Sequence, residues 1–134
     1  MMNELSDIIV KFLIGKYDPY LIILFGSAAK EEMHAESDID IAFLSEDKYD
    51  SYSTFMSAQE LADLIGFEID LLDLSRASTV MQVQVIGNGK VLYKKDRNKS
   101  SAFMTKTLKA YTMLNDERKC IFDRIKERGS VYAK

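Results

Sequence analysis

"LFGSAAKEEMHAESDIDIAFLSED", the stretch from Leu24 to Asp47, decides the fold because it joins the ends of two strand-like segments. The first segment, "YLIILFG", is a short unbroken apolar run between Pro19 and Gly26, which is typical of a buried strand. In the second, "DIDIAFLS", apolar and polar residues alternate with a period of two, which predicts a strand with two distinct faces. We therefore expect two strands joined by a polar segment.

The flanking sequence predicts further helices and strands. Apolar residues recur at helical spacing from Leu5 to Leu13, and this helix is expected to stop at Gly15. Downstream, "DSYSTFMSAQELADLIG" predicts a second helix with Gly66 as its stop, its apolar stripe being Phe55, Leu61, Leu64 and Ile65. The alternation in "FEIDLLDL" predicts a third strand. A short helix ended by "GNG" and a brief strand, "KVLY", follow.

The order of these elements predicts an α/β fold (α+β) in a single domain over residues 1–134. The core is expected over about 1–95, and a long helix over about 101–128. The charged segment "KKDRNKSS" between them is expected to be exposed and to act as a hinge. The apolar stripe of the long helix is expected to be chiefly core packing, with its far end free to dock a partner if the helix outreaches the body: Phe103, Tyr111, Leu114, Ile121 and Ile125.

Composition restricts the class of protein. The formal net charge is −3 and the pI is about 5.2, so the surface is not organised for direct nucleic-acid binding. The single cysteine, Cys120, cannot form an internal disulfide and fits a reducing compartment. No apolar run approaches the roughly 18 residues that span a bilayer, and the first residues carry acids where a signal peptide carries bases. We expect a soluble cytoplasmic protein.

The Asp-Ile-Asp triplet carries the most chemistry. Residues two apart on a strand point to the same side, so Asp38 and Asp40 project together and repel each other unless a cation or a shared proton intervenes. Asp70, on the predicted third strand, is a candidate third carboxylate if that strand pairs alongside. Three oxygen donors without clustered His or Cys suit Mg²⁺ or Mn²⁺. The competing interpretation is the solvent face of an amphipathic strand.

Gly26 and Ser27 stand after a buried strand and before a probable helix start. Backbone N–H groups and the helix dipole favour an anion there, and the Ser27 hydroxyl can donate to a phosphate oxygen. Alone, this pair is equally an ordinary helix cap. Together with the carboxylates it supplies a phosphate anchor and a metal site, which suits transfer of a phosphoryl or nucleotidyl group.

The Gly26-Ser27 pair, ten intervening residues and then Asp38-Ile39-Asp40 resemble the motif of the DNA polymerase β-like nucleotidyltransferase superfamily. Length and element order are similar to its minimal nucleotidyltransferase (MNT) branch. The resemblance implies the polymerase β-like fold, with a mixed sheet backed by helices. It also implies two divalent metal ions, Mg²⁺ or Mn²⁺, on Asp38 and Asp40, and ATP as substrate. It also implies that Asp70 completes the site and helps deprotonate the acceptor hydroxyl, while Gly26 and Ser27 hold the terminal phosphates.

The resemblance also implies a biological role. Minimal members are commonly antitoxins paired with a HEPN-domain ribonuclease toxin, with which they associate, and they transfer AMP from ATP to a tyrosine of that toxin with release of pyrophosphate. Many relatives carry an Arg-Ala-Arg-Gly-like run after Gly-Ser, whereas this chain has "AAKEE". Ala28 replaces one expected base and Lys30 stands for another, as a point charge without the bidentate fork of Arg.

Two other functions stay open on the sequence. The chain could be a non-catalytic antitoxin that inhibits the toxin by binding it, and the altered loop after Ser27 keeps this alternative open. It could also be a small-molecule adenylyltransferase, although 134 residues leave little chain for a separate acceptor pocket. A toxin that gains AMP would indicate protein adenylylation, whereas a toxin that is silenced without gaining AMP would indicate inhibition by binding.

Overall fold

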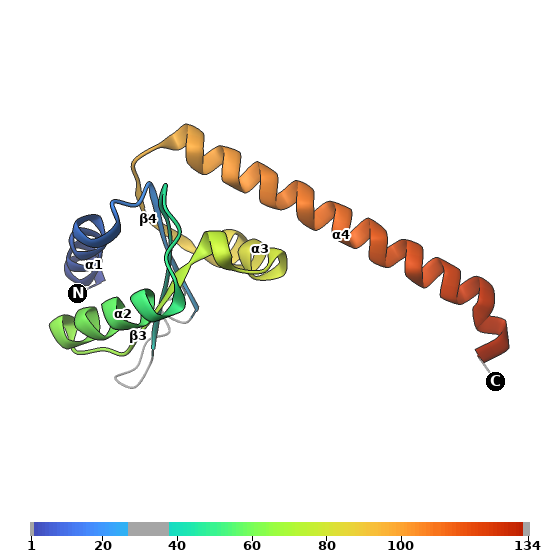
Figure 1. Cartoon of the computed structure of the whole chain (residues 1–134), viewed down its shortest axis with the longest axis horizontal. Helices are drawn as coiled ribbons and strands as arrows, with labels where there is room; N and C mark the ends of the chain where they lie inside the picture. Colours follow the sequence, from blue (N-terminus) through green and yellow to red (C-terminus); the bar gives the residue numbers. More distant parts are fainter. Residues whose placement is uncertain (1, 27–37, 133–134) are drawn as a thin grey trace.

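The structure, a computed structural model, describes the backbone of residues 2–26 and 38–132 and the side chains of 4–26 and 38–116. A four-stranded sheet in the order β3-β2-β1-β4 carries α1 and α2 on one face and α3 with the start of α4 on the other (Figure 1). The elements in chain order are α1 (Met2–Tyr17), β1 (Leu21–Phe25), β2 (Ile39–Leu44), α2 (Ser51–Ile65), β3 (Ile69–Asp73), the 3-10 helix η2 (Leu74–Arg76), α3 (Thr79–Asn88), β4 (Lys90–Lys94) and α4 (Arg97–Tyr132).

The sheet is mixed, as predicted. β1 pairs antiparallel with β2 and with β4, whereas β2 and β3 run parallel. A parallel pair needs a crossover connection, and α2 supplies it between β2 and β3. In this register Asp40 lies opposite Asp70, so the two predicted acidic strands are neighbours.

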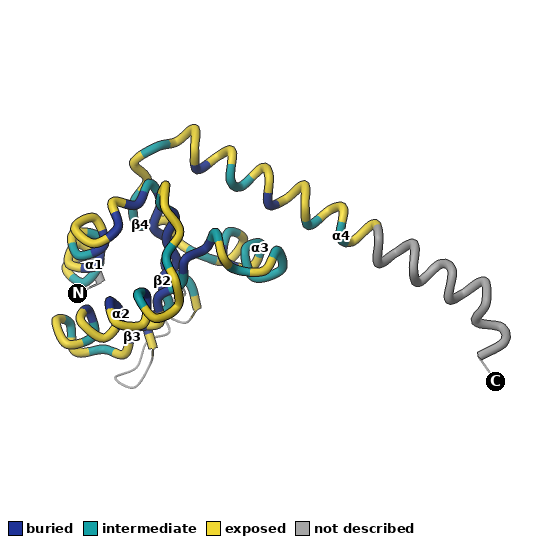
Figure 2. The backbone as a smooth tube through the Cα atoms, in the orientation of Figure 1, coloured by how far each residue is buried: buried dark blue, intermediate teal, exposed yellow. Residues whose placement is uncertain are grey.

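Each face of the sheet buries its own apolar layer, and the buried segments concentrate in the sheet (Figure 2). Ile39, Ile41 and Phe43 pack toward α1 and α2, where Tyr17 stacks on Phe43 with ring centroids 4.5 Å apart. Ala42 and Leu44 point to the opposite layer, which α3 and α4 cover. The period of two in β2 therefore separates two cores, and Asp40 shares the face of Ala42.

The predicted stop of the first helix at Gly15 is wrong, because α1 continues to Tyr17. The residue that leaves the helical conformation is Asp18, with φ 44°, and its N–H donates to the Ile14 carbonyl (3.1 Å). Aspartate tolerates this left-handed conformation better than most residues other than glycine. Gly15 itself remains helical.

The predicted stripe of α2 is partly wrong. Phe55 and Leu64 are 58% and 65% exposed, whereas the helix turns Ala58 and Leu61 into the core. The buried positions recur at helical spacing and include hydroxyl side chains, which an apolar pattern overlooks: Thr54, Ser57, Ala58 and Leu61. The predicted stop at Gly66 is confirmed, with φ 79° and an N–H that donates to the Ala62 carbonyl (2.8 Å).

The long helix α4 begins directly after β4, where the Asp96 side chain accepts a hydrogen bond from the Lys99 N–H (2.9 Å). The predicted hinge is thus a short connection, held to the body by an ion pair between Lys95 and Asp18 (3.1 Å). Within the described part of the chain, no helix is long and apolar enough to cross a membrane.

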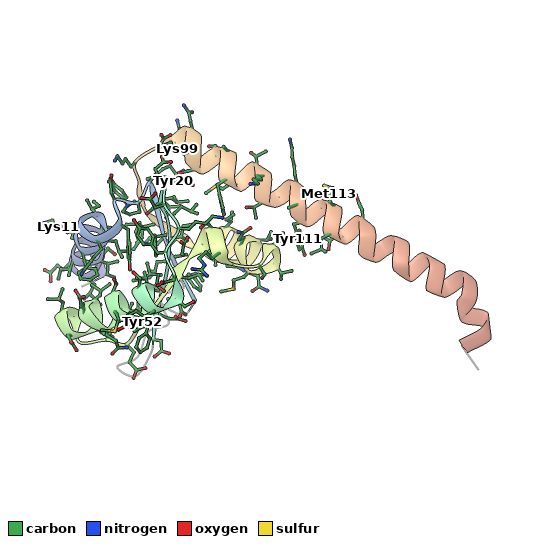
Figure 3. The ribbon with its side chains drawn as sticks, in the orientation of Figure 1. Lys11, Tyr20, Tyr52, Lys99, Tyr111 and Met113 are labelled. Atoms are coloured by element: carbon green, nitrogen blue, oxygen red, sulfur yellow. The ribbon has the colours of Figure 1, made fainter. Side chains whose placement is uncertain are left out.

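The prediction that the apolar stripe of α4 is chiefly core packing is only partly right for its described residues. Phe103 packs against the sheet layer, and Phe103, Tyr111 and Leu114 are each partly buried, with none of them fully buried. The fully packed positions of α4, among those described, are Ser100 and Thr107. Figure 1 shows α4 leaving the body, and Figure 3 shows Met113, 64% exposed, on the part that extends past α3. The predicted positions Ile121 and Ile125 lie outside the described side chains.

Candidate active site

Four acidic residues lie on neighbouring positions where β2 and β3 begin. Asp40 and Asp70 are direct neighbours in the parallel register, and Asp38 and Glu68 precede them by two residues on the same face. Asp40 is half-buried, and the other three are exposed. The structure therefore brings together the three predicted carboxylates and adds Glu68, which the alternation of "FEIDLLDL" places beside Asp70 but gives no separate reason to select.

The electrostatics of the cluster disfavour four negative charges. Burial raises the pKa of Asp40, and the charges of Asp70 and Asp38 raise it further. A hydrogen bond with Asp38 raises the pKa of Glu68, and the negative charge of Asp38 raises it further. The cluster is thus ready to accept positive charge, as a proton or as a cation.

Gly26 directly follows β1 and lies next to the side chain of Asp40. Its φ of 72° is a conformation that favours glycine. A Cβ on this residue would also overlap Oδ2 of Asp40, so any other residue here would displace that carboxylate from its present position. The first residue of the predicted phosphate anchor therefore lies beside the predicted metal ligands. Ser27 and Lys30, the other two predicted anchor residues, lie outside the described residues.

The chemistry of the donors fits a hard divalent cation, because every candidate ligand is a carboxylate oxygen. In the described residues, however, no three His, Cys, Asp or Glu side chains are already gathered around one point. Asp38 turns toward Glu68, and Asp40 turns toward Gly26. To bind one ion, the side chains of Asp38 and Asp40 would have to rotate toward each other.

A groove of about 720 Å³ continues from the carboxylates along the outer edge of β3. Asp38, Glu68 and Asp70 line one end, and Tyr49 and Arg76 line it further along. Every residue of β3 lines the groove, and α2 provides the facing wall through Ser51, Thr54, Phe55, Ala58, Gln59 and Ala62. The carboxylate cluster is therefore continuous with a groove at the edge of the sheet that the sequence analysis did not predict.

Asp73 fixes the wall of this groove. This carboxylate is 3% exposed and accepts hydrogen bonds from the Tyr49 N–H (2.9 Å), the Ser75 N–H (3.1 Å) and the Ser75 hydroxyl (2.7 Å). An Nη of Arg76 donates to the Tyr49 carbonyl (2.8 Å). The Asp-Leu-Ser spacing is typical of a local side-chain turn, but no local signal indicates the partner at Tyr49.

Comparison with known proteins places this geometry in context. The family model for polymerase β nucleotidyltransferases matches residues 7–98, a span that contains Gly26 and all four carboxylates. The chain is 41% identical over 103 residues to the protein adenylyltransferase MntA of Shewanella oneidensis, covering 77% of this chain and 73% of that protein. It is 29% identical over 119 residues to MntA of Aphanizomenon flos-aquae, covering 80% and 79%.

Two solved structures show the same fold at substantial identity. One is a toxin–antitoxin complex with AMP-PNP, whose matching chain is 37% identical with a TM-score of 0.80, over 90% of this chain and 97% of that one. The other is a tri-AMPylated HEPN toxin of Shewanella oneidensis in complex with an MNT antitoxin, at 35% identity and a TM-score of 0.78, over 93% and 98%.

Proposed function

We propose that this chain, which belongs to the polymerase β nucleotidyltransferase family, is a protein adenylyltransferase that transfers AMP from ATP to a tyrosine of a cognate HEPN toxin and thereby acts as its antitoxin. The observation that carries the proposal is the register of β2 and β3, which sets Asp40 opposite Asp70 next to Gly26. Similarity to the adenylyltransferase MntA and to the antitoxin beside a tri-AMPylated toxin supports the acceptor class.

The nucleotide would bind at the end of β1. Gly26 leaves room for the terminal phosphates because it carries no side chain, and the Ser27 hydroxyl and the Lys30 ammonium would donate to them. An ATP analogue is present in a similar toxin–antitoxin structure. Asp38, Asp40 and Asp70 would hold two Mg²⁺ ions, with Mn²⁺ as a substitute, and these would neutralise the negative charge of the triphosphate.

Asp70 would act as the general base toward the acceptor hydroxyl. Its carboxylate, exposed at the outer side of the cluster, would take the proton of the acceptor hydroxyl. The hydroxyl oxygen then forms a bond to the α-phosphorus of ATP, and the bond from that phosphorus to the bridging oxygen breaks. Pyrophosphate leaves with the electron pair, and AMP remains on the acceptor.

A second function, inhibition by binding alone, is favoured by one observation. The described outer part of α4 carries exposed apolar side chains, Leu108 at 49% and Met113 at 64%, which offer a partner contact surface away from the carboxylates. Such a protein would silence the toxin without modifying it.

The test is intact-mass spectrometry of the toxin after incubation with this chain, ATP and Mg²⁺. Asp38→Asn and Asp40→Asn should reduce AMP transfer at least about 100-fold, because each removes a charge from the reacting centre. Asp63→Asn makes the same change at an exposed position of α2 and should transfer at the wild-type rate. A toxin that is silenced by wild type with no added mass would establish inhibition by binding instead.

A further inference from the structure

We propose that the groove between β3 and α2 docks the acceptor segment of the partner protein, as an extended polypeptide lying along the free edge of β3. This inference rests on the proposed function, because it assigns a place to the substrate of the same site. It is carried by the position of the groove relative to the carboxylates, by the free strand edge and by the charges that line the groove.

The position of the groove separates the two substrates. Across the sheet, the end of β1 with Gly26 comes first, then Asp40 on β2, then Asp70 on β3, and then the groove. A nucleotide held at Gly26 and a chain held in the groove would therefore approach the carboxylates from opposite sides. Asp70 belongs to both the cluster and the groove wall, which is where a residue that takes the acceptor proton must lie.

The outer edge of β3 is free to pair. Among the described residues, β2 is the only strand that pairs with β3. The Ile39 N–H donates to the Glu68 carbonyl (2.8 Å), so the backbone groups of Glu68 turn toward β2. Because successive residues alternate, the backbone groups of Ile69 and Leu71 turn toward the groove. An extended polypeptide can satisfy them by adding a strand to this edge.

The lining of the groove selects against anionic occupants. Three carboxylates line its inner end, and Arg76 is the one cation among its described lining residues, with a hydrogen bond to the Tyr49 carbonyl. Bound Mg²⁺ would neutralise the carboxylates of the inner end, but along the rest of the groove an anion would meet one cation, Arg76, that is already hydrogen-bonded, whereas a neutral or basic polypeptide is accommodated. Phe55, 58% exposed on the facing wall, offers an aromatic surface for a side chain of the acceptor segment.

Substitution of Phe55 tests the proposal. Phe55→Ala removes the aromatic wall, and Phe55→Glu adds a charge that opposes entry. Leu64→Ala is the matched control, because Leu64 is 65% exposed on the same helix and does not line the groove. Both positions are solvent-exposed, so the melting temperatures of all three variants should stay near wild type. For each variant, the KM for the toxin, the dissociation constants for the toxin and for AMP-PNP with Mg²⁺, and the oligomeric state are measured.

Both Phe55 variants should raise the KM and the dissociation constant for the toxin at least about tenfold, which corresponds to a loss of ~1.4 kcal/mol of binding free energy. Their affinity for AMP-PNP should be unchanged, and Leu64→Ala should behave like wild type in every measurement. Unchanged toxin binding would overturn the proposal. Weakened AMP-PNP binding would assign the groove to the nucleotide, and a changed oligomeric state of the free chain would assign it to a second copy; either result also overturns it. If wild type transfers no AMP, the proposed function fails, and the toxin affinities of the variants still decide the docking surface.

Discussion

At the scale of single residues, Asp40 is placed at a cost to stability. Burial and the charges of Asp70 and Asp38 raise the pKa of Asp40 in the folded chain. The stabilising contribution of the protonated Asp40 is therefore fully present below the usual carboxyl pKa of about 4, and it is lost as the pH rises through the raised pKa of the folded chain. We therefore predict that Asp40→Asn, measured without divalent ions, raises the melting temperature by a few degrees at pH 7. The gain should vanish when the pH falls below about 4.

The same measurement separates a local effect from a general reduction in charge. Asp63→Asn, with the same change of charge at an exposed site on α2, should leave the melting temperature close to wild type at both pH values. Added Mg²⁺ should raise the melting temperature of the wild-type chain more than that of Asp40→Asn, since a ligand of the native state stabilises it. A melting temperature of Asp40→Asn below wild type at pH 7 would contradict this account.

At the scale of elements, the contact between β3 and the segment before α2 depends on one buried carboxylate. Asp73→Ala removes the acceptor of three hydrogen bonds, two of them from backbone N–H groups, and should lower the free energy of unfolding by about 2 kcal/mol or more. Urea denaturation measures this loss. Asp47→Ala, an exposed acid of the same segment, serves as the control, and an equal effect of both substitutions would contradict a specific role for Asp73.

Local periodicity explains why much of the architecture can be predicted from the sequence. The alternation around Asp38 to Phe43 defines the faces of β2, and the same alternation around Asp70 defines β3, so the carboxylates share a face once the strands pair. Contacts between distant segments give no such signal. Tyr49 and Asp73 are 24 positions apart, and the exposure of Phe55 depends on which turn of α2 meets the sheet.

At the scale of the whole molecule, we propose that residues 1–134 act as one minimal nucleotidyltransferase unit, with a body that carries the site and a helix, α4, that reaches beyond it (Figure 1). The described part of α4 changes character along its length. Ser100 and Thr107 are buried against the body, whereas Leu108 and Met113 are exposed. An isolated helical segment is only marginally stable in water, so packing should decide local stability.

We therefore predict that, in hydrogen exchange of the free chain, amides from Ser100 to Thr107 exchange more slowly than those from Leu108 to Asp116. Binding of the toxin should slow the second group if the partner covers the exposed apolar side chains of α4. The amides of β1, which lie in the buried centre of the sheet, serve as the reference for global opening. Equal exchange rates of both helix groups in the free chain would show that the stability of α4 does not depend on the body. Unchanged exchange rates of the second group in the complex would leave the β3 groove and the carboxylate cluster as the surfaces through which the toxin is recognised.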